Sequence, residues 1–421
     1  MDLLVKNGRV IDPARKLDVV ANVVIRDGII RSIGKEAVKD IPEFDATGLV
    51  VAPGFFDIHV HLREPGTEEA ETIATGGAAA AAGGFVAVAA MPNTRPPNDN
   101  PSITSYIIAE ARRSSPVLVF PIGAITKEQK GETLAEIGEM IEAGVAGISD
   151  DGKPVMDSRL FRRALEYSRM FDAPVIQHCE DLNLSKGGVM HEGAFSARLG
   201  LKGIPSAAES TIVSRDVILA ELTGAKYHVA HVSTREAVDM VRKAKAAGLN
   251  VTAEATPHHF TLTDAAVAEY DTNAKMNPPL RSQDDVDAIR RGLADGTIDA
   301  IASDHAPHHI NLKMLEFDRA PFGITGLETA VGLGFTQLNL SLDTLITLFS
   351  LNPQKIMRVK RWGLFEGSEG HLTIVDPHRK WKFDVNQSRS KSRNSPFNGF
   401  EFTGKAVGTI VGGKVVYEDM P

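Results

Sequence analysis

Two histidines separated by one residue, His59 and His61, lie at the end of the apolar run Phe55–Val60. In an extended strand, residues two apart point to the same side, so both imidazoles can face one ion. Imidazole and carboxylate ligands together suit zinc or a similar divalent ion. Further residues of these types follow other apolar runs, and they are Asp151, His178, His231 and Asp304. One ion rarely needs six protein ligands, so the set predicts one or two ions.

A bound divalent ion lowers the pKa of water towards neutrality, and a neighbouring carboxylate can take up the proton and return it to a leaving nitrogen. Each residue also has a structural explanation when it is taken alone. His178 or His231 could be a satisfied core histidine, and Asp304 could be a helix N-cap. Their joint occurrence at strand ends, in order along one chain, favours a metal-dependent hydrolase in which a carboxylate beside the metal moves the proton.

The middle of the chain alternates between apolar runs and amphipathic stretches such as Leu134–Ala143 and Arg159–Phe171. This alternation predicts a closed (β/α)8 barrel, in which reactive groups lie at the C-terminal ends of the strands. A doubly wound open sheet is the alternative, but the Gly-rich phosphate fingerprint after its first strand is missing. The expected strands are 55–60, 85–90, 117–122, 145–148, 174–176, 227–230, 251–253 and 299–302.

Both ends of the chain contain short strand-like runs separated by turn residues. Asn7-Gly8 and Asp27-Gly28 each lie between apolar segments, where such pairs favour tight hairpin turns. Similar runs recur after residue 371. We therefore expect residues 1–52 and 366–421 to form one small β-sandwich domain together, and residues 53–365 to form the barrel.

The composition excludes several classes of protein. The net charge of −8 and the lack of a basic block argue against nucleic-acid binding, and the mixed stretch Arg389–Arg393 is expected to be a solvated loop. No run approaches the roughly 20 apolar residues of a membrane helix, and the first residues do not resemble a signal peptide. Cys179 is the one cysteine, so an intrachain disulfide is impossible. We expect a cytoplasmic protein.

Six longer strings make the comparison with known families specific. Over essentially its whole length the chain resembles the bacterial type I dihydroorotases of the amidohydrolase superfamily. The strings are HVHLREPG from His59, MPNT from Met91, SDDGKPV from Ser149, NPPLR from Asn277, SDHAPH from Ser303 and PFGI from Pro321. The resemblance implies reversible conversion of L-dihydroorotate and water to N-carbamoyl-L-aspartate, a step of pyrimidine biosynthesis.

The resemblance also implies roles for individual residues. His59 and His61 would hold one zinc ion, His178 and His231 a second, and Asp151 would take the place of the carboxylated lysine that bridges the metals in many relatives. Asp304 would be both ligand and acid/base. The substrate carboxylate would be held by Arg63, Asn93 and His308, and the ring by Asn277 and the backbone of Phe322 and Gly323. An arginine fork suits a carboxylate.

Several alternatives stay open at this point. Asp150 or Lys153 could replace Asp151, although Gly152 and Pro154 mark the end of the strand. The enzyme could be a dihydropyrimidinase, hydantoinase or allantoinase, or the protein could be a non-catalytic scaffold of aspartate transcarbamoylase. A homo-oligomer and a transcarbamoylase partner are expected by analogy only. The stretch 309–313 is less acidic than is usual in the family, which puts loop closure over the substrate in doubt.

Overall fold

Eight parallel strands form the central sheet of the computed structural model, which describes residues 1–35, 38 and 40–420. Their order in the sheet is the order in the sequence, so each strand pairs with the next one along the chain. The strands are β6 (Phe55–Val60), β7 (Phe85–Ala90), β8 (Leu118–Gly123), β9 (Gly147–Ser149), β10 (Val175–Gln177), β13 (Tyr227–Val229), β14 (Val251–Ala255) and β15 (Ala300–Ile301). All eight overlap the expected runs.

The sheet closes on itself next to the first strand. Val60 at the end of β6 forms a parallel bridge with His305, which follows β15, and His61 N–H donates to the carbonyl of His305 at 2.8 Å. The strands are buried on both faces, which explains their nearly continuous apolar sequences. The expected (β/α)8 barrel is therefore confirmed, and it places the ends of all eight strands around one rim.

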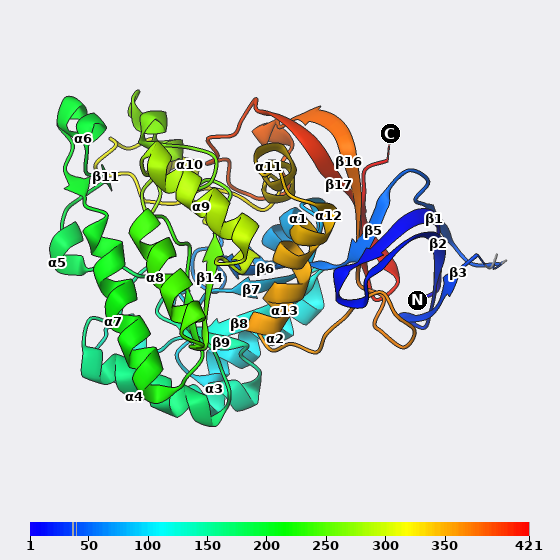
Figure 1. The fold of residues 1–421 in the computed structure, drawn as a ribbon, viewed down its shortest axis with the longest axis horizontal. Coiled ribbons are helices and arrows are strands. Elements are labelled where there is room, and N and C mark those ends of the chain that lie inside the picture. Colours follow the sequence, from blue (N-terminus) through cyan, green and yellow to red (C-terminus); the bar gives the residue numbers. More distant parts are fainter. Residues whose placement is uncertain (36–37, 39, 421) are drawn as a thin grey trace.

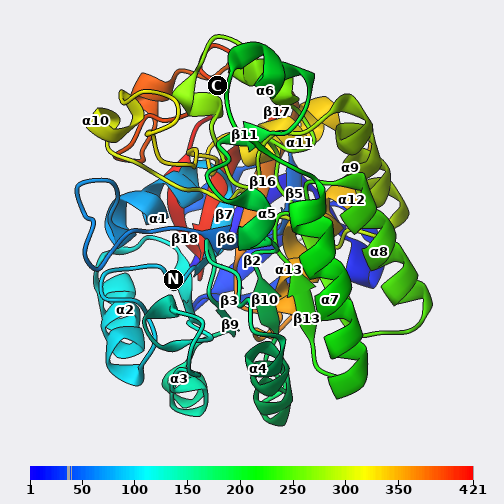
Figure 2. The ribbon, with the colours of Figure 1, turned by 90° about the vertical axis from the view of Figure 1, so that its left-hand side faces the viewer.

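Helices surround this barrel (Figures 1 and 2). Amphipathic helices such as α4 bury one apolar side against the strands, with Phe161 and Leu165 inaccessible to solvent. The main helices are α1 (Ile73–Ala82), α2 (Pro101–Ser114), α3 (Ile137–Ala143), α4 (Ser158–Met170), α7 (Ala207–Thr223), α8 (Arg235–Ala246), α9 (Gln283–Asp295), α11 (Ala330–Gln337), α12 (Leu342–Ile346) and α13 (Asn352–Ile356). Short elements lie in the loops, namely α5 (Leu182–Ser185), β11 (Met190–His191), α6 (Ala194–Leu199), β12 (Gly203–Ile204) and α10 (Ile310–Lys313).

A second sheet combines strands from both ends of the chain, and the two termini lie on its side of the molecule (Figure 1). Its central pairing joins β5 to β16, which are more than 300 residues apart, and this confirms the expected composite β unit. The limits at residues 52 and 366 stay a prediction. The strands are β1 (Leu3–Asp12), β2 (Leu17–Arg26), β3 (Ile29–Gly34), β4 (Glu43–Asp45), β5 (Val50–Pro53), β16 (Leu372–Lys382), β17 (Glu401–Val411) and β18 (Lys414–Glu418).

Of the two hairpin turns predicted near the N-terminus, one is present and one is not. Asp27 and Gly28, with φ angles of 53° and 77°, form the turn between β2 and β3 as expected. The prediction of a hairpin at Asn7-Gly8 was wrong, because β1 continues through both residues. The pairing register with β2 shifts between Val5 and Gly8, so the positive φ of Asn7 (60°) belongs to a bulge. The pair Asn7-Gly8 indicates a positive φ angle, and both hairpin turns and β-bulges contain residues with positive φ, so the pair alone does not distinguish them.

The stretch Arg389–Arg393 was also misjudged in part. It is a loop, and Arg389 and Lys391 are exposed to solvent, but Ser390 and Ser392 are buried. Ser390 hydroxyl and Lys391 N–H both donate to Glu71, which lies in the connection between β6 and α1. Alternating exposed cations and buried hydroxyls therefore attach this loop of the composite sheet to the barrel.

Candidate active site

A cavity of about 330 Å³ opens at the C-terminal ends of the barrel strands. Eleven of the twelve residues expected to bind metal or substrate line it, and the twelfth, His59, is completely buried. The eleven residues are His61, Arg63, Asn93, Asp151, His178, His231, Asn277, Asp304, His308, Phe322 and Gly323. The fold therefore brings the whole predicted set to one place.

Asp151 lies at the centre of four histidines. Its Oδ1 is 3.3 Å from His59 Nε2 and 3.5 Å from His231 Nε2, and its Oδ2 is 3.4 Å from His61 Nε2. His178 Nδ1 is 3.9 Å away. Two triplets of ligand atoms, each within 4.8 Å, share Asp151: one with His59 and His61, the other with His178 and His231.

The donor set fits a divalent cation. In the described part of the chain, His59 Nε2 and Asp151 Oδ1 are buried and lack a hydrogen-bond partner, although they lie close together. A buried polar atom without a partner costs roughly 1–3 kcal/mol, so such atoms are expected to gather where an ion supplies the missing interaction. Imidazole nitrogens around a shared carboxylate are ligands that zinc accepts.

The two histidines of the His-x-His pair are oriented from behind by acceptors. His61 Nδ1 donates to Asn93 Oδ1 at 2.8 Å, and His59 Nδ1 donates to Glu254 Oε1 at 2.5 Å. Both rings therefore present Nε2 to the centre of the cluster. Glu254 was missed in the sequence analysis. The sequence feature that could have indicated Glu254 is a glutamate within an otherwise apolar strand, because a buried carboxylate is rare unless its charge is paired.

Glu254 also binds the next strand. Its Oε2 accepts from His228 Nε2 at 3.1 Å, and its Oε1 accepts the backbone N–H of His231 at 3.3 Å. Burial alone would raise the pKa of Glu254, but His59 and His228 bring this pKa down to about 2. A buried, ionised carboxylate thus joins β6, β13 and β14 behind the metal ligands.

Glu180 has a comparable position on the other side of the cluster. Its Oε2 accepts from His178 Nε2 at 2.9 Å and from Asn277 Nδ2 at 2.8 Å. Burial opposes ionisation, yet the hydrogen bond from His178 lowers the pKa of Glu180 to about 2. His178 consequently turns Nδ1 towards Asp151. Asn277, expected to contact the ring, keeps its amide oxygen available to the cavity.

Asp304 lies beside the His-x-His pair, with Oδ1 3.1 Å from His61 Nε2 and 3.6 Å from His59 Nε2. Burial alone would raise its pKa, but the charges of His59 and His61 hold the pKa of Asp304 well below its usual range. Its φ of 47° and that of His231, 32°, lie in the left-handed region. Such backbone strain is frequent at functional sites.

The alternatives to Asp151 have other positions. Asp150 accepts the backbone N–H groups of Ile125 and Thr126 at 2.8 and 3.0 Å, so its carboxylate is occupied in joining two loops. Lys153 is exposed and follows the strand end. Asp151 is therefore the one of these three side chains that reaches the histidines.

The same cavity is also lined by Arg63 and His308, which lie next to each other. Arg63 Nε donates to the carbonyl of Pro307 at 3.0 Å, and burial lowers the pKa of Arg63 only to about 10, so it is charged at neutral pH. His308 Nε2 donates to the carbonyl of Phe322 at 2.7 Å. Burial and the charge of Arg63 lower the pKa of His308 to about 3, so this ring is neutral.

Two further buried histidines and the cysteine have structural contacts. His259 hydrogen-bonds the Thr256 hydroxyl and the carbonyl of Pro278, so both of its ring nitrogens are occupied. His305 bonds Glu71 and the backbone N–H of Gly326. Cys179 is buried against Tyr227, and burial raises the pKa of its thiol well above the usual value. His258 is also buried, and its Nε2 has no hydrogen-bond partner among the described residues.

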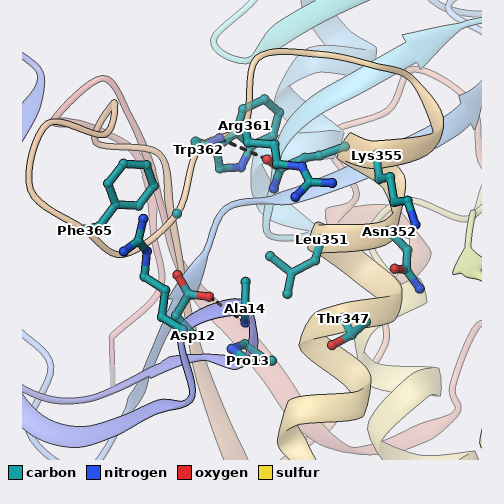
Figure 3. A pocket seen from close by; sticks show the side chains of 13 residues that line it. Asp12, Pro13, Ala14, Thr347, Leu351, Asn352, Lys355, Arg361, Trp362 and Phe365 are labelled. Carbon is teal, nitrogen blue, oxygen red and sulfur yellow. Dashed lines mark hydrogen bonds between the residues drawn. The ribbon is translucent and has the colours of Figure 1, made fainter.

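A larger cavity of about 880 Å³ lies elsewhere (Figure 3). It is lined by Asp12 and Arg15 from the composite sheet and by Lys355, Arg361 and Trp362 from the barrel side. Trp362 Nε1 donates to the carbonyl of Gly54, which immediately precedes β6, so this cavity is at the opposite ends of the strands. It has no histidine, and we place the active site in the smaller cavity.

Comparison with known proteins agrees with this site. Residues 48–237 match the family model described as "Dihydro-orotase-like". The chain is 56% identical to a dihydroorotase from Solibacter usitatus, with 98% of this chain and 97% of that protein covered. It is 52% identical to a dihydroorotase from Geobacter metallireducens, covering 99% and 100%. The fold matches the L-hydantoinase from Arthrobacter aurescens with a TM-score of 0.89 at 24% identity, covering 100% and 97%.

The identity to these dihydroorotases, together with the barrel, the composite sheet and the histidine–aspartate cluster, identifies a cyclic amidohydrolase. Within that class, the identity over nearly the full length shows that the chain belongs to the dihydroorotase family. The chain is therefore an enzyme that acts on a small molecule. Among the described residues, no helix is both long and apolar enough to cross a membrane.

Proposed function

We propose that this enzyme converts L-dihydroorotate and water reversibly to N-carbamoyl-L-aspartate, and that zinc is its metal. The observation that supports the substrate is that charged Arg63 and neutral His308 line the same cavity as the Asp151 cluster and lie side by side there. A ring amide placed at the cluster would direct its carboxylate to this pair. Hydantoin and allantoin have no carboxylate to use it, so the pair favours dihydroorotate over the substrates of the related enzymes.

The residues that would hold one or two zinc ions are those around Asp151. His59 and His61 form one group and His178 and His231 the second, with Asp151 common to both and Asp304 beside the first. When bound, such an ion supplies Lewis acidity, which polarises an amide carbonyl and lowers the pKa of water. Asn93, Glu254 and Glu180 keep the donating nitrogens turned to the centre.

The protein's own groups have three tasks in this reaction. Arg63 binds and orients the carboxylate through a charge-assisted pair. Asp304 accepts a proton from the attacking water and delivers a proton to the ring nitrogen as the carbon–nitrogen bond breaks. The backbone of Phe322 and Gly323, with Asn277, borders the space for the ring. In the reverse direction Asp304 takes the proton from the carbamoyl nitrogen and returns it to the departing water.

The test is a steady-state assay in both directions with dihydroorotate and carbamoyl aspartate, and with hydantoin and allantoin in parallel. We expect turnover of the first pair, and activity restricted to the neutral ring amides would contradict the substrate. Metal analysis should find one or two zinc ions per chain. Chelation should abolish activity and zinc should restore it; full activity after complete metal removal would contradict the zinc proposal.

Three expectations on assembly and location are part of the proposal. By analogy with relatives we propose a homo-oligomer, a possible complex with aspartate transcarbamoylase, and a cytoplasmic location. Light scattering of the purified protein, alone and mixed with the transcarbamoylase, tests the first two. A monomer that gains no mass on mixing would contradict both.

A further inference from the structure

One side chain from a loop of the composite sheet contacts two loops that line the cavity. Asn394 lies in the loop between β16 and β17 and is 2% exposed. Its Nδ2 donates to the carbonyl of Ala306 at 3.1 Å and to the carbonyl of Gly323 at 3.0 Å. Its Oδ1 accepts the backbone N–H of His308 at 3.1 Å. Both ends of the amide are thus used to join two separate loops.

These two loops form part of the cavity wall. Ala306, His308 and Gly323 all line the cavity. The main chain of Asn394 adds a fourth bond, because its carbonyl accepts the N–H of Thr325 at 2.8 Å. Asn394 therefore determines the separation between the loop that contains His308 and the loop that contains Phe322 and Gly323.

Gly323 is held from its other side by two lysines. Lys313 Nζ donates to the carbonyls of Gly323 and Pro321 at 3.1 and 3.0 Å, and Gly323 N–H donates to the carbonyl of Lys275 at 2.9 Å. Gly323 has a φ of 128°, and a Cβ there would lie 2.8 Å from the Cβ of Ala306. The two loops are in contact at this point, so a small displacement of Asn394 would move both.

Asn394 is itself fixed in place by its own loop. Ser392 hydroxyl donates to the carbonyl of Ala70 at 2.7 Å, and the neighbouring Ser390 and Lys391 bind Glu71. Ala70 and Glu71 lie in the connection that follows β6, the strand of His59. The loop of Asn394 is thus attached to the barrel at Glu71, which is eight residues after Arg63 in the sequence.

We propose that Asn394 is a positioning residue for the substrate carboxylate, acting through His308 and Gly323. It is outside both groups of metal-ligand atoms and does not line the cavity. Its effect is on binding: loss of its amide lets the two loops separate and removes this ordered part of the cavity wall. Binding groups held to within about 0.5 Å by supporting hydrogen bonds are what an accurate site requires. This inference rests on the proposed substrate.

The test replaces Asn394 by leucine, which has a similar size and no hydrogen-bonding group. We expect Asn394→Leu to raise KM for dihydroorotate and for carbamoyl aspartate by about tenfold or more, to change kcat by less than about threefold, and to keep the wild-type metal content. Thr409→Val is the matched control, because it removes a buried hydrogen bond between the composite sheet and the barrel, from the Thr409 hydroxyl to the carbonyl of Ala81, without touching the loop of Asn394. Its KM should stay within about twofold of wild type.

The outcomes separate this inference from the proposed function. A wild-type enzyme without activity on dihydroorotate would contradict the proposed substrate. With an active wild type, an unchanged KM in Asn394→Leu, or an equal rise of KM in Thr409→Val, would overturn the positioning role. If the leucine variant does not fold, Asn394→Ala gives the same comparison without a bulky apolar group. If neither variant folds, Asn394 is a residue of global stability and the proposal is wrong.

Discussion

Asp304 combines three properties that an acid and base for this reaction needs. It lines the cavity, it lies 3.1 Å from His61 Nε2, and its ionised form is favoured by the neighbouring histidines. We predict that Asp304→Asn lowers kcat by about 10²- to 10⁴-fold, the usual contribution of a general acid or base. Circular dichroism should show an intact fold. Asp284→Asn, at an exposed position, is the control, and an unimpaired Asp304→Asn would remove Asp304 from this role.

Arg63 is the group that distinguishes this cavity from one for a neutral ring. Its guanidinium lies beside His308 and is held by the carbonyl of Pro307. We predict that Arg63→Met raises KM for dihydroorotate by about 100-fold or more, corresponding to the 3 kcal/mol at the upper end for a hydrogen bond to a charged group. Arg63→Lys should recover only part of this loss, because an ammonium lacks the planar fork. Unchanged KM in both variants would refute the contact.

Glu254 orients the proposed metal ligand His59 without lining the cavity itself. It accepts from His59 and His228 and is completely buried. We predict that Glu254→Gln lowers metal affinity by about 10- to 100-fold, since the glutamine cannot hold the His59 ring with a full charge. Competition with a chromogenic chelator measures this affinity. Wild-type affinity in the variant would show that His59 is oriented without Glu254.

The ligands themselves could be predicted from the sequence, whereas Glu254, Glu180 and Asn394 were missed. His59 and His61 could be recognised as ligands because they are two residues apart in one strand, where alternate side chains point to the same side. Glu254 is 195 positions from His59 and Asn394 is 86 positions from His308, although Glu180 is only two residues from His178. No local pattern indicates which buried carboxylate will face which histidine. Only the closed barrel brings β6 and β14 within hydrogen-bonding distance.

At the scale of elements, strand positions were predictable because a parallel strand buried on both faces must be apolar throughout. All eight were located from apolar runs, with ends that differ by only a few residues. The loops were less predictable. Arg389–Arg393 has a hydrophilic composition, yet Ser390 and Ser392 are buried because their hydrogen bonds are satisfied by the barrel loops. Polarity alone does not distinguish a solvated loop from one that is buried and fully bonded.

The stretch 309–313, where the sequence departs from the family, forms helix α10 and part of the wall behind Gly323. Lys313 is buried there, and burial together with the charge of Lys275 lowers the pKa of Lys313 to about 7. The unfolded chain keeps a lysine pKa of about 10.4. Between these values the unfolded chain binds a proton that the folded chain does not, so folding becomes more favourable as pH rises.

We therefore predict a pH-dependent difference between wild type and Lys313→Met. From pH 7 to 10 the free energy of unfolding of the wild type should rise relative to the variant, by at most about 1.4 kcal/mol per pH unit. Denaturant titrations of both proteins at pH 7, 8 and 9 measure this difference. Lys355→Met, at an exposed position, is the control. A constant difference would mean that the carbonyls of Pro321 and Gly323 keep Lys313 protonated throughout.

At the scale of the whole molecule, one apolar cluster extends from the barrel into the composite sheet, which also has a buried cluster of its own. Phe402 of β17 and Val375 of β16 belong to the same buried cluster as Phe55 and Phe85 of the barrel. Polar contacts join the two units as well: Thr373 hydroxyl accepts the N–H of Phe55 and donates to the carbonyl of Gly84. The sheet is therefore not an appended module, and its loop at Asn394 completes the active-site wall.

The shared core leads to a prediction about unfolding. The chain has two tryptophans: Trp362 donates to Gly54 at the start of the barrel, and Trp381 lies in β16 and packs near Gly332 of α11. Trp381→Phe leaves Trp362 as the one tryptophan, and Trp362→Phe leaves Trp381, so tryptophan fluorescence then reports on the barrel and on the sheet separately. We predict that both variants unfold at the same denaturant midpoint, after correction for the stability cost of each substitution. Separate domains joined by a small interface would unfold in two steps. Two distinct midpoints would show that the sheet and the barrel are thermodynamically independent, and the Asn394 contact would then be lost before the barrel itself unfolds.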